Sequence, residues 1–243
     1  MPDPAFSDPD LVSRYAQVCQ RIERAARLVQ RSADDITIVA VTKTHPIEAI
    51  RKARAIGITN FGENRVQETL EKLGDTGFLQ ADSQSCLHLI GHLQRNKVRK
   101  AVQIFDSIDS IDSIELAEAV DSEAKRAGKV LRVLLEVNTS KELQKQGMDP
   151  TQALSVAQSV ASLTHLQLAG LMTVGPLTND VDHIRNSFKI LKDTFDDVGA
   201  RLKMPGWSAL SMGMSGDYEI AIEEGATEIR LGTALFGQRS NVT

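Results

Sequence analysis

Residues 36–46 read "ITIVAVTKTHP", and this stretch decides the fold. The run ITIVAV is apolar and rich in β-branched residues, which is typical of a strand buried on both faces. Pro46 then marks the start of a helix, so Lys43 lies just beyond the carboxyl end of a buried strand. Ligand sites of α/β folds gather at that end of their strands, which makes Lys43 a candidate functional residue.

The same order of strand and helix repeats along the chain. We expect strands at residues 36–42, 59–61, 86–90, 104–109, 130–137, 166–173, 207–212 and 228–231. We expect helices between them at residues 46–56, 64–73, 94–102, 113–127, 150–163, 181–202 and 217–224. Alternation of this kind implies parallel pairing, and eight units in 243 residues predict a closed (β/α)8 barrel rather than an open sheet.

An extra helix is expected before the first strand. Apolar residues recur at helical spacing from Asp10, a plausible N-cap, to about residue 29. Residues 1–9 are acidic and rich in proline, which predicts a disordered arm, and residues 73–85 form a candidate mobile loop. Because no long linker or shift of composition interrupts the chain, residues 1–243 are predicted to form one domain.

Composition excludes several functional classes. The formal net charge of −4 argues against general nucleic-acid binding, which needs clustered positive charge. No apolar stretch is long enough for a membrane span, and the N-terminus lacks the features of a signal peptide. Cys19 and Cys86 do not suggest a disulfide framework. We therefore expect a cytoplasmic protein.

The position of Lys43 allows two interpretations. A loop lysine is commonly solvated and without function. Partial burial at a strand end would instead lower the pKa of its amine, which could then form a Schiff base with an aldehyde.

Two glycine-containing loops predict an anion site on the same rim. The segment "SMGMSGD" runs from Ser211 to Asp217 and ends at the expected start of a helix, and Gly232 and Thr233 follow the last strand. Such loops aim backbone N–H groups at an anion, and barrels often bind phosphate after strands seven and eight. The alternative is that these glycines only make tight turns.

Arg230 shares a strand face with Gly232, because residues two apart in a strand point the same way. A buried arginine needs an acceptor. This acceptor is either a barrel carboxylate, such as Glu136 or Glu228, or a ring nitrogen or anion of a ligand.

A lysine and a phosphate site across one barrel mouth leave two ligand classes open. One is a phosphorylated carbonyl sugar, as in a lysine-dependent aldolase, and the other is pyridoxal 5′-phosphate. An arginine that faces a ring nitrogen favours the second. The five histidines show no metal-ligand spacing, so no metal site is predicted, and His88 is interpreted as a satisfied core residue.

The motifs together resemble those of the pyridoxal phosphate homeostasis proteins, which are relatives of the alanine racemase N-terminal barrel. They are "AVTKTHP", "FGENRVQE", "LIGHLQRNK", "SIDS", "GLMT", "LSMGMSGD" and "IRLGTALFG". The resemblance implies an aldimine link between the cofactor and Lys43, with Arg230 facing the ring nitrogen and Asn64 near the cofactor. It implies phosphate contacts from Ser211, Gly213, Met214, Ser215, Gly216, Gly232 and Thr233.

The resemblance also implies a role in vitamin B6 balance, with no catalytic residues and no efficient catalysis. An arginine opposite the ring nitrogen disfavours its protonation and weakens the electron sink that carbanion chemistry needs. The alternative is a minimal amino-acid racemase or lyase. We expect a monomer without the racemase's second domain, and apo-enzymes that need the cofactor are the expected partners.

Overall fold

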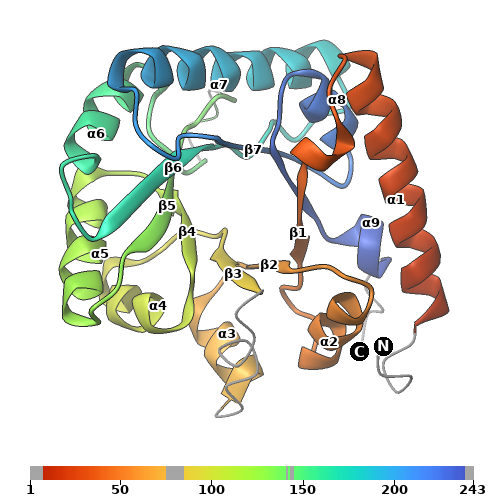
Figure 1. The fold of residues 1–243 in the computed structure, drawn as a ribbon, viewed down its shortest axis with the longest axis horizontal. Coiled ribbons are helices and arrows are strands. Elements are labelled where there is room, and N and C mark those ends of the chain that lie inside the picture. The colour runs from red at the N-terminus through yellow and green to blue at the C-terminus, as the bar shows by residue number, and fades with distance from the viewer. Residues whose placement is uncertain (1–7, 75–84, 141, 143–144, 239–243) are drawn as a thin grey trace.

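The computed structural model describes residues 8–74, 85–140, 142 and 145–238. Eight parallel strands close into a barrel in chain order, with the last strand paired to the first (Figure 1). They are β1 (Thr37–Val41), β2 (Asn60–Glu63), β3 (Cys86–Leu89), β4 (Ser107–Ile111), β5 (Leu131–Glu136), β6 (Leu166–Met172), β7 (Ala209–Met214) and β8 (Glu228–Leu231). The predicted (β/α)8 barrel is confirmed. The proposed mobile loop at residues 73–85 falls mostly outside the described residues.

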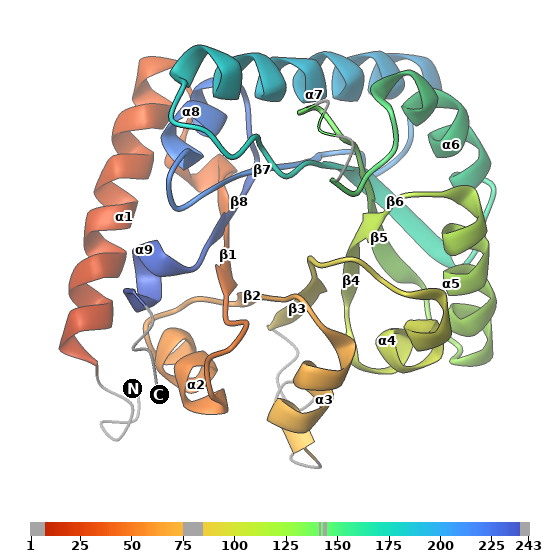
Figure 2. The same cartoon turned by 180° about the vertical axis from the view of Figure 1, so that it is seen from behind.

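Helices surround the barrel on its outer face (Figures 1 and 2). The α-helices are α1 (Pro9–Leu28), α2 (Ile47–Ala55), α3 (Val66–Leu73), α4 (Val98–Ile104), α5 (Ile114–Arg126), α6 (Ala153–Val160), α7 (Val181–Leu202), α8 (Tyr218–Glu223) and α9 (Thr233–Phe236). Short 3-10 turns are η2 (Ala33–Asp35), η4 (Arg95–Lys97) and η5 (Pro150–Gln152). No helix in the described part of the chain is both long and apolar enough to cross a membrane.

Helix α1 begins slightly earlier than predicted. The Asp8 carboxylate accepts a hydrogen bond of 3.0 Å from the backbone N–H of Leu11, and Pro9 occupies the first helical turn. The prediction of Asp10 as the N-cap is wrong, since Asp10 lies inside the first turn. Asp8 as the N-cap and Pro9 after it together start the helix earlier than the pattern of apolar residues indicated. Residues 8 and 9 of the predicted arm are therefore ordered, and its residues 1–7 lie outside the described part.

The extra helix completes the outer wall between α8 and α9 (Figures 1 and 2). The guanidinium of Arg21 pairs with both oxygens of Glu219 in α8, and Arg14 donates to the backbone carbonyl of Leu235 in α9 at 2.5 Å. Its buried residues are Leu11, Val18, Ile22, Ala25 and Ala26. Helix α1 is thus part of the core and not an appendage.

The fourth strand is shifted relative to its prediction. The residues of "IFDSID" were expected to form a strand at 104–109, but Ile104 ends helix α4 and the strand runs from Ser107 to Ile111. Phe105 is completely buried just after the helix, so its apolar character reflects core packing and not strand pairing. A short apolar run does not by itself distinguish a strand from the end of a buried helix.

Helix α1 gives a test of the packing account. Ile22 is 3% exposed and Val12, on the same helix, is 46% exposed. We expect Ile22→Ala to lower the free energy of unfolding by about 2–5 kcal/mol, because it leaves a cavity in the wall. The matched change Val12→Ala should cost less than about 0.5 kcal/mol. Equal effects of the two changes in denaturant unfolding would show that α1 does not contribute to the core.

Candidate functional site

The interior of the barrel is organised in layers by the alternation of each strand. In β5, Arg132, Leu134 and Glu136 share the inward face. Arg132 reaches across the interior to pair with Glu228 of β8, which confirms that this face points inward. Leu134 belongs to a small apolar cluster separate from the main core. Glu136 ends the strand, at the rim where the loops form a ligand site.

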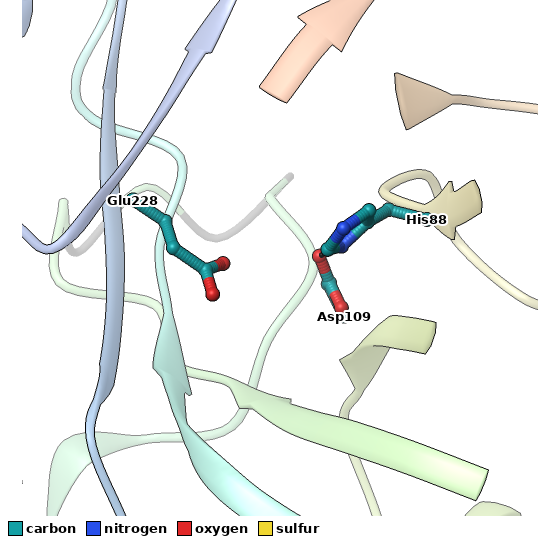
Figure 3. Close-up of side chains that lie close together, drawn as sticks. All are labelled: His88, Asp109 and Glu228. Atoms are coloured by element: carbon teal, nitrogen blue, oxygen red, sulfur yellow. Dashed lines mark hydrogen bonds and ion pairs between the residues drawn. The ribbon is translucent and has the colours of Figure 1, made fainter. Parts of the chain in front are cut away.

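The interior of the barrel holds an ion network. The Nδ1 atom of His88 lies 2.8 Å from a carboxylate oxygen of Asp109, and its Nε2 atom lies 3.1 Å from the side-chain oxygen of Asn60. Glu228 faces these two groups from β8 (Figure 3). Burial opposes protonation of His88, but the Asp109 carboxylate outweighs it and raises the pKa of His88 well above its ordinary value. Both ring nitrogens of His88 have protein partners, as expected for a satisfied core residue.

Three side chains of this network are of the kinds that bind metal ions, but their charges are already balanced by protein groups. The ligand-type atoms of His88, Asp109 and Glu228 all lie within 4.8 Å of one another. The guanidinium of Arg132 already pairs with Glu228 and, at 3.5 Å, with Asp109. Two carboxylates are therefore balanced by Arg132 and by protonated His88. A cation in this position would face the charge of Arg132 at short range, so the cluster fits an internal ion network better than a metal centre.

The carboxyl ends of β1, β7 and β8 border a cavity of about 310 Å³, close to the lower end of the range of small-ligand pockets. It is lined by Val41, Lys43, His45, Ile90, Met214, Ser215, Gly216, Arg230, Gly232, Thr233 and Gly237. Seven of the predicted site residues therefore meet in one place. Lys43 is half-buried at the end of β1, on the same inward face as Val41.

Arg230 lines this cavity and is only 3% exposed. One guanidinium nitrogen donates to the hydroxyl of Ser211 at 2.8 Å, and another donates to the backbone carbonyl of Thr173 at 2.6 Å. The described part of the chain shows no hydrogen bond from Arg230 to Glu136 or Glu228, the two protein partners that the sequence suggested. Burial lowers the pKa of Arg230, and nearby carboxylates oppose the shift. Ser211 thus holds the arginine and does not line the cavity.

The loops after β7 and β8 are joined into one cup. The hydroxyl of Ser215 accepts hydrogen bonds from the backbone N–H groups of Gly232 at 3.3 Å and Ala234 at 3.1 Å. Gly213 does not line the cavity. Its φ of +92° favours glycine, and an added Cβ would lie 2.5 Å from the Cβ of Ala221. Gly213 therefore lets the end of β7 pack closely against α8.

Asn64 lies in a separate cavity of about 450 Å³, which Lys43 does not line. Arg65, His92 and Lys97 share that cavity with it. The backbone of Asn64 packs against Gly91, where an added Cβ would lie 2.3 Å from the Asn64 carbonyl oxygen. The structure therefore does not bring Asn64 together with the other predicted site residues.

Sequence reasoning missed five residues around the site, and one of them is Gly237, which lines the cavity. Val41 and Ile90 line the cavity and could have been found from strand alternation, because they share faces with Lys43 and His88. His45 also lines it, with its ring 5.0 Å from that of Phe236. Thr173 contributes only its backbone carbonyl to Arg230, for which a side-chain pattern gives no signal.

Glu136 is the unusual acid of this region. Its side chain is 6% exposed, and burial raises its pKa to about 7, although Arg230 opposes the shift. Its carboxyl therefore keeps its proton in the folded protein over a range in which it ionises in the unfolded chain. The contribution of Glu136 to folding stability is lost as the pH rises from about 4.5 to about 7.

Glu136→Gln tests this burial. We expect the unfolding free energy of the wild type, measured relative to Glu136→Gln, to fall by about 3 kcal/mol between pH 4.5 and pH 8. The control Glu118→Gln, on the exposed surface of α5, should follow the wild-type pH dependence. If the difference in unfolding free energy between wild type and Glu136→Gln is constant across this pH range, the pKa of the Glu136 carboxyl is not raised.

Comparison with known proteins gives the relationships of this site and fold. The family model described as the alanine racemase N-terminal domain matches residues 19–240. A pyridoxal phosphate homeostasis protein of Vibrio cholerae is 37% identical over 224 residues, which cover 91% of this chain and 93% of the relative. Relatives with the same name from other organisms match at similar identity, among them the human one at 35% over 229 residues.

Solved structures agree with these relationships. The structure of PipY from Synechococcus elongatus with PLP bound is 37% identical and has a TM-score of 0.76, over 89% of this chain and 100% of that chain. An alanine racemase of Clostridium difficile has a TM-score of 0.70 at 15% identity, over 96% of this chain and 58% of that one, which supports the fold alone. The chain therefore belongs to the pyridoxal phosphate homeostasis protein family and has the alanine racemase N-terminal barrel.

Proposed function

We propose that this protein binds pyridoxal 5′-phosphate between β1, β7 and β8 and serves vitamin B6 homeostasis in the cytoplasm. The observation that carries the proposal is that an amine, a buried guanidinium and two hydroxyl-bearing loops line one cavity of about 310 Å³. These are the groups that an aldehyde, a pyridine ring and a phosphate need. The relatives' name and the bound ligand of PipY support the same ligand.

Lys43 is the proposed covalent anchor. Its neutral amine adds to the cofactor aldehyde, one water leaves, and the carbon–nitrogen double bond of a Schiff base forms. Lys43 follows the carboxyl end of β1 and lines the cavity, so its amine can reach an aldehyde bound there.

The loops after β7 and β8 are the proposed phosphate site. Ser215 and Thr233 offer hydroxyl groups, and Gly216 and Gly232 offer backbone that a phosphate can approach closely. Ser211 and Gly213 act indirectly, the first through Arg230 and the second by shaping the loop. Asn64 is proposed to act near the cofactor only at the rim, since it lies in the neighbouring cavity.

Arg230 is proposed to face the ring nitrogen. A guanidinium can only donate hydrogen bonds, so it favours the unprotonated nitrogen as acceptor. Pyridoxal 5′-phosphate supplies an electron sink when bound, and this sink is weaker when its ring nitrogen is unprotonated. The arrangement therefore supports storage or delivery of the cofactor without efficient turnover. We propose that the protein is a monomer and that it passes the cofactor to apo-enzymes.

A minimal amino-acid racemase or lyase is the second candidate function. Glu136 favours it, because a carboxyl with a pKa of about 7 near Arg230 suits proton transfer at neutral pH.

Cofactor transfer separates the two candidates. Protein loaded with pyridoxal 5′-phosphate and desalted is expected to restore an apo-enzyme that requires it, and to racemise L-alanine no faster than free cofactor does. Lys43→Ala should lose the cofactor during desalting, because only weak noncovalent contacts remain. Lys97→Ala, in the neighbouring cavity, should behave as the wild type.

Two results would contradict the proposal. Wild-type protein that retains no cofactor after desalting would overturn binding itself. Racemisation faster than with free cofactor, and lost in Glu136→Gln, would replace the homeostasis role by the enzymatic one.

A further inference from the structure

The loop that carries Lys43 has an unusual backbone. Thr44, the next residue, has a φ of +64°, a left-handed conformation that a β-branched residue rarely adopts. Such a conformation is strained and persists only where the surroundings enforce it. The residues that hold Thr44 therefore also fix the direction in which Lys43 leaves the strand.

Helix α3 holds the residue after Lys43. The backbone N–H of Thr44 donates a hydrogen bond of 2.6 Å to a carboxylate oxygen of Glu68. Glu68 lies on the first turns of α3, and its side chain is 30% exposed. A hydrogen bond to a charged acceptor is stronger than one between neutral groups, so this contact can offset the strain at Thr44.

The same helix holds the residue before Lys43. The amine of Lys72 donates to the backbone carbonyl of Thr42 at 2.8 Å and to Glu63 at 2.6 Å. The hydroxyl of Thr42 donates to the same oxygen of Glu63 at 2.7 Å. Glu63 is fully buried, and the Lys72 side chain is 7% exposed. Burial raises the pKa of Glu63, and the charge of Lys72 opposes the shift.

The two contacts form one unit. Glu68 and Lys72 are four residues apart on α3, and their charged groups lie 3.9 Å apart. Glu68 accepts a hydrogen bond from the backbone of Thr44, and Lys72 donates one to the backbone of Thr42. The helix therefore fixes the backbone on both sides of Lys43. These side chains do not line the cofactor cavity.

We propose that Glu68 and Lys72 are positioning residues for the Lys43 amine. They set the backbone of Thr42 and Thr44, and so place the amine where it can reach the cofactor aldehyde. The inference rests on the proposed function, because it concerns the same covalent anchor.

Binding of two ligands to Glu68 variants tests the inference. Pyridoxal 5′-phosphate can react with Lys43, whereas pyridoxine 5′-phosphate has no aldehyde and can bind only noncovalently. We expect Glu68→Ala to weaken retention of pyridoxal 5′-phosphate roughly tenfold or more. Its affinity for pyridoxine 5′-phosphate should stay within about twofold of the wild type, since the cavity itself is intact.

Three controls make the result specific. Glu68→Gln keeps an acceptor for the Thr44 N–H and should largely rescue retention. Glu71→Ala, on the exposed side of the same helix, should match the wild type. In a Lys43→Ala background, Glu68→Ala should have no further effect on either ligand, because there is no amine to position.

The outcomes distinguish this inference from the proposed function. If wild-type protein binds neither ligand, the proposed function fails, and if it binds both equally and forms no covalent adduct, its covalent anchor at Lys43 fails. If wild-type protein forms the adduct but Glu68→Ala retains the cofactor as well as Glu71→Ala does, only the positioning role fails. Equal weakening of both ligands in Glu68→Ala would show a general structural role and would also overturn the inference.

Discussion

The pairing of β1 with β8 is the constraint on which the site depends. These strands come from opposite ends of the chain, and their parallel register sets Val39 opposite Arg230 and Ala40 opposite Leu231. Because the strands end at the same level, the loop after β1 faces the loop after β8. An amine from one end of the sequence thus meets the hydroxyls and backbone N–H groups of the other.

Closure of the barrel also encloses an interior that side chains must fill. Inward positions alternate with outward ones, and here many of them carry charge. Four of these charged groups form one network. They are His88, Asp109, Arg132 and Glu228, which pair with one another inside the barrel. Leu134 and Met172 belong to a small apolar cluster, Arg230 lines the ligand cavity, and Glu136 ends β5. The four groups of the network therefore balance one another, whereas Arg230 is held by the neutral oxygens of Ser211 and Thr173.

Sequence patterns could predict the fold and the rim residues because both depend on local rules. Strand ends locate Lys43, and a period of two places Arg230 and Gly232 on one face. The partners of Arg230 could not be predicted, because Ser211 and a backbone carbonyl of Thr173 reach it only through the register of three strands. In the sequence, the spacing of Glu68 and Lys72 is that of an ordinary exposed ion pair on a helix. Their role depends on the path of the Lys43 loop, which no sequence spacing encodes.

The most direct test of the account is the chemical identity of the anchoring residue. Wild-type protein is incubated with pyridoxal 5′-phosphate, reduced with borohydride to make any Schiff base permanent, digested, and mapped by mass spectrometry. We predict one phosphopyridoxyl group per chain, on the peptide that contains Lys43, and none on that peptide in Lys43→Arg. Modification spread over surface lysines, or a single stable adduct on another lysine, would contradict it.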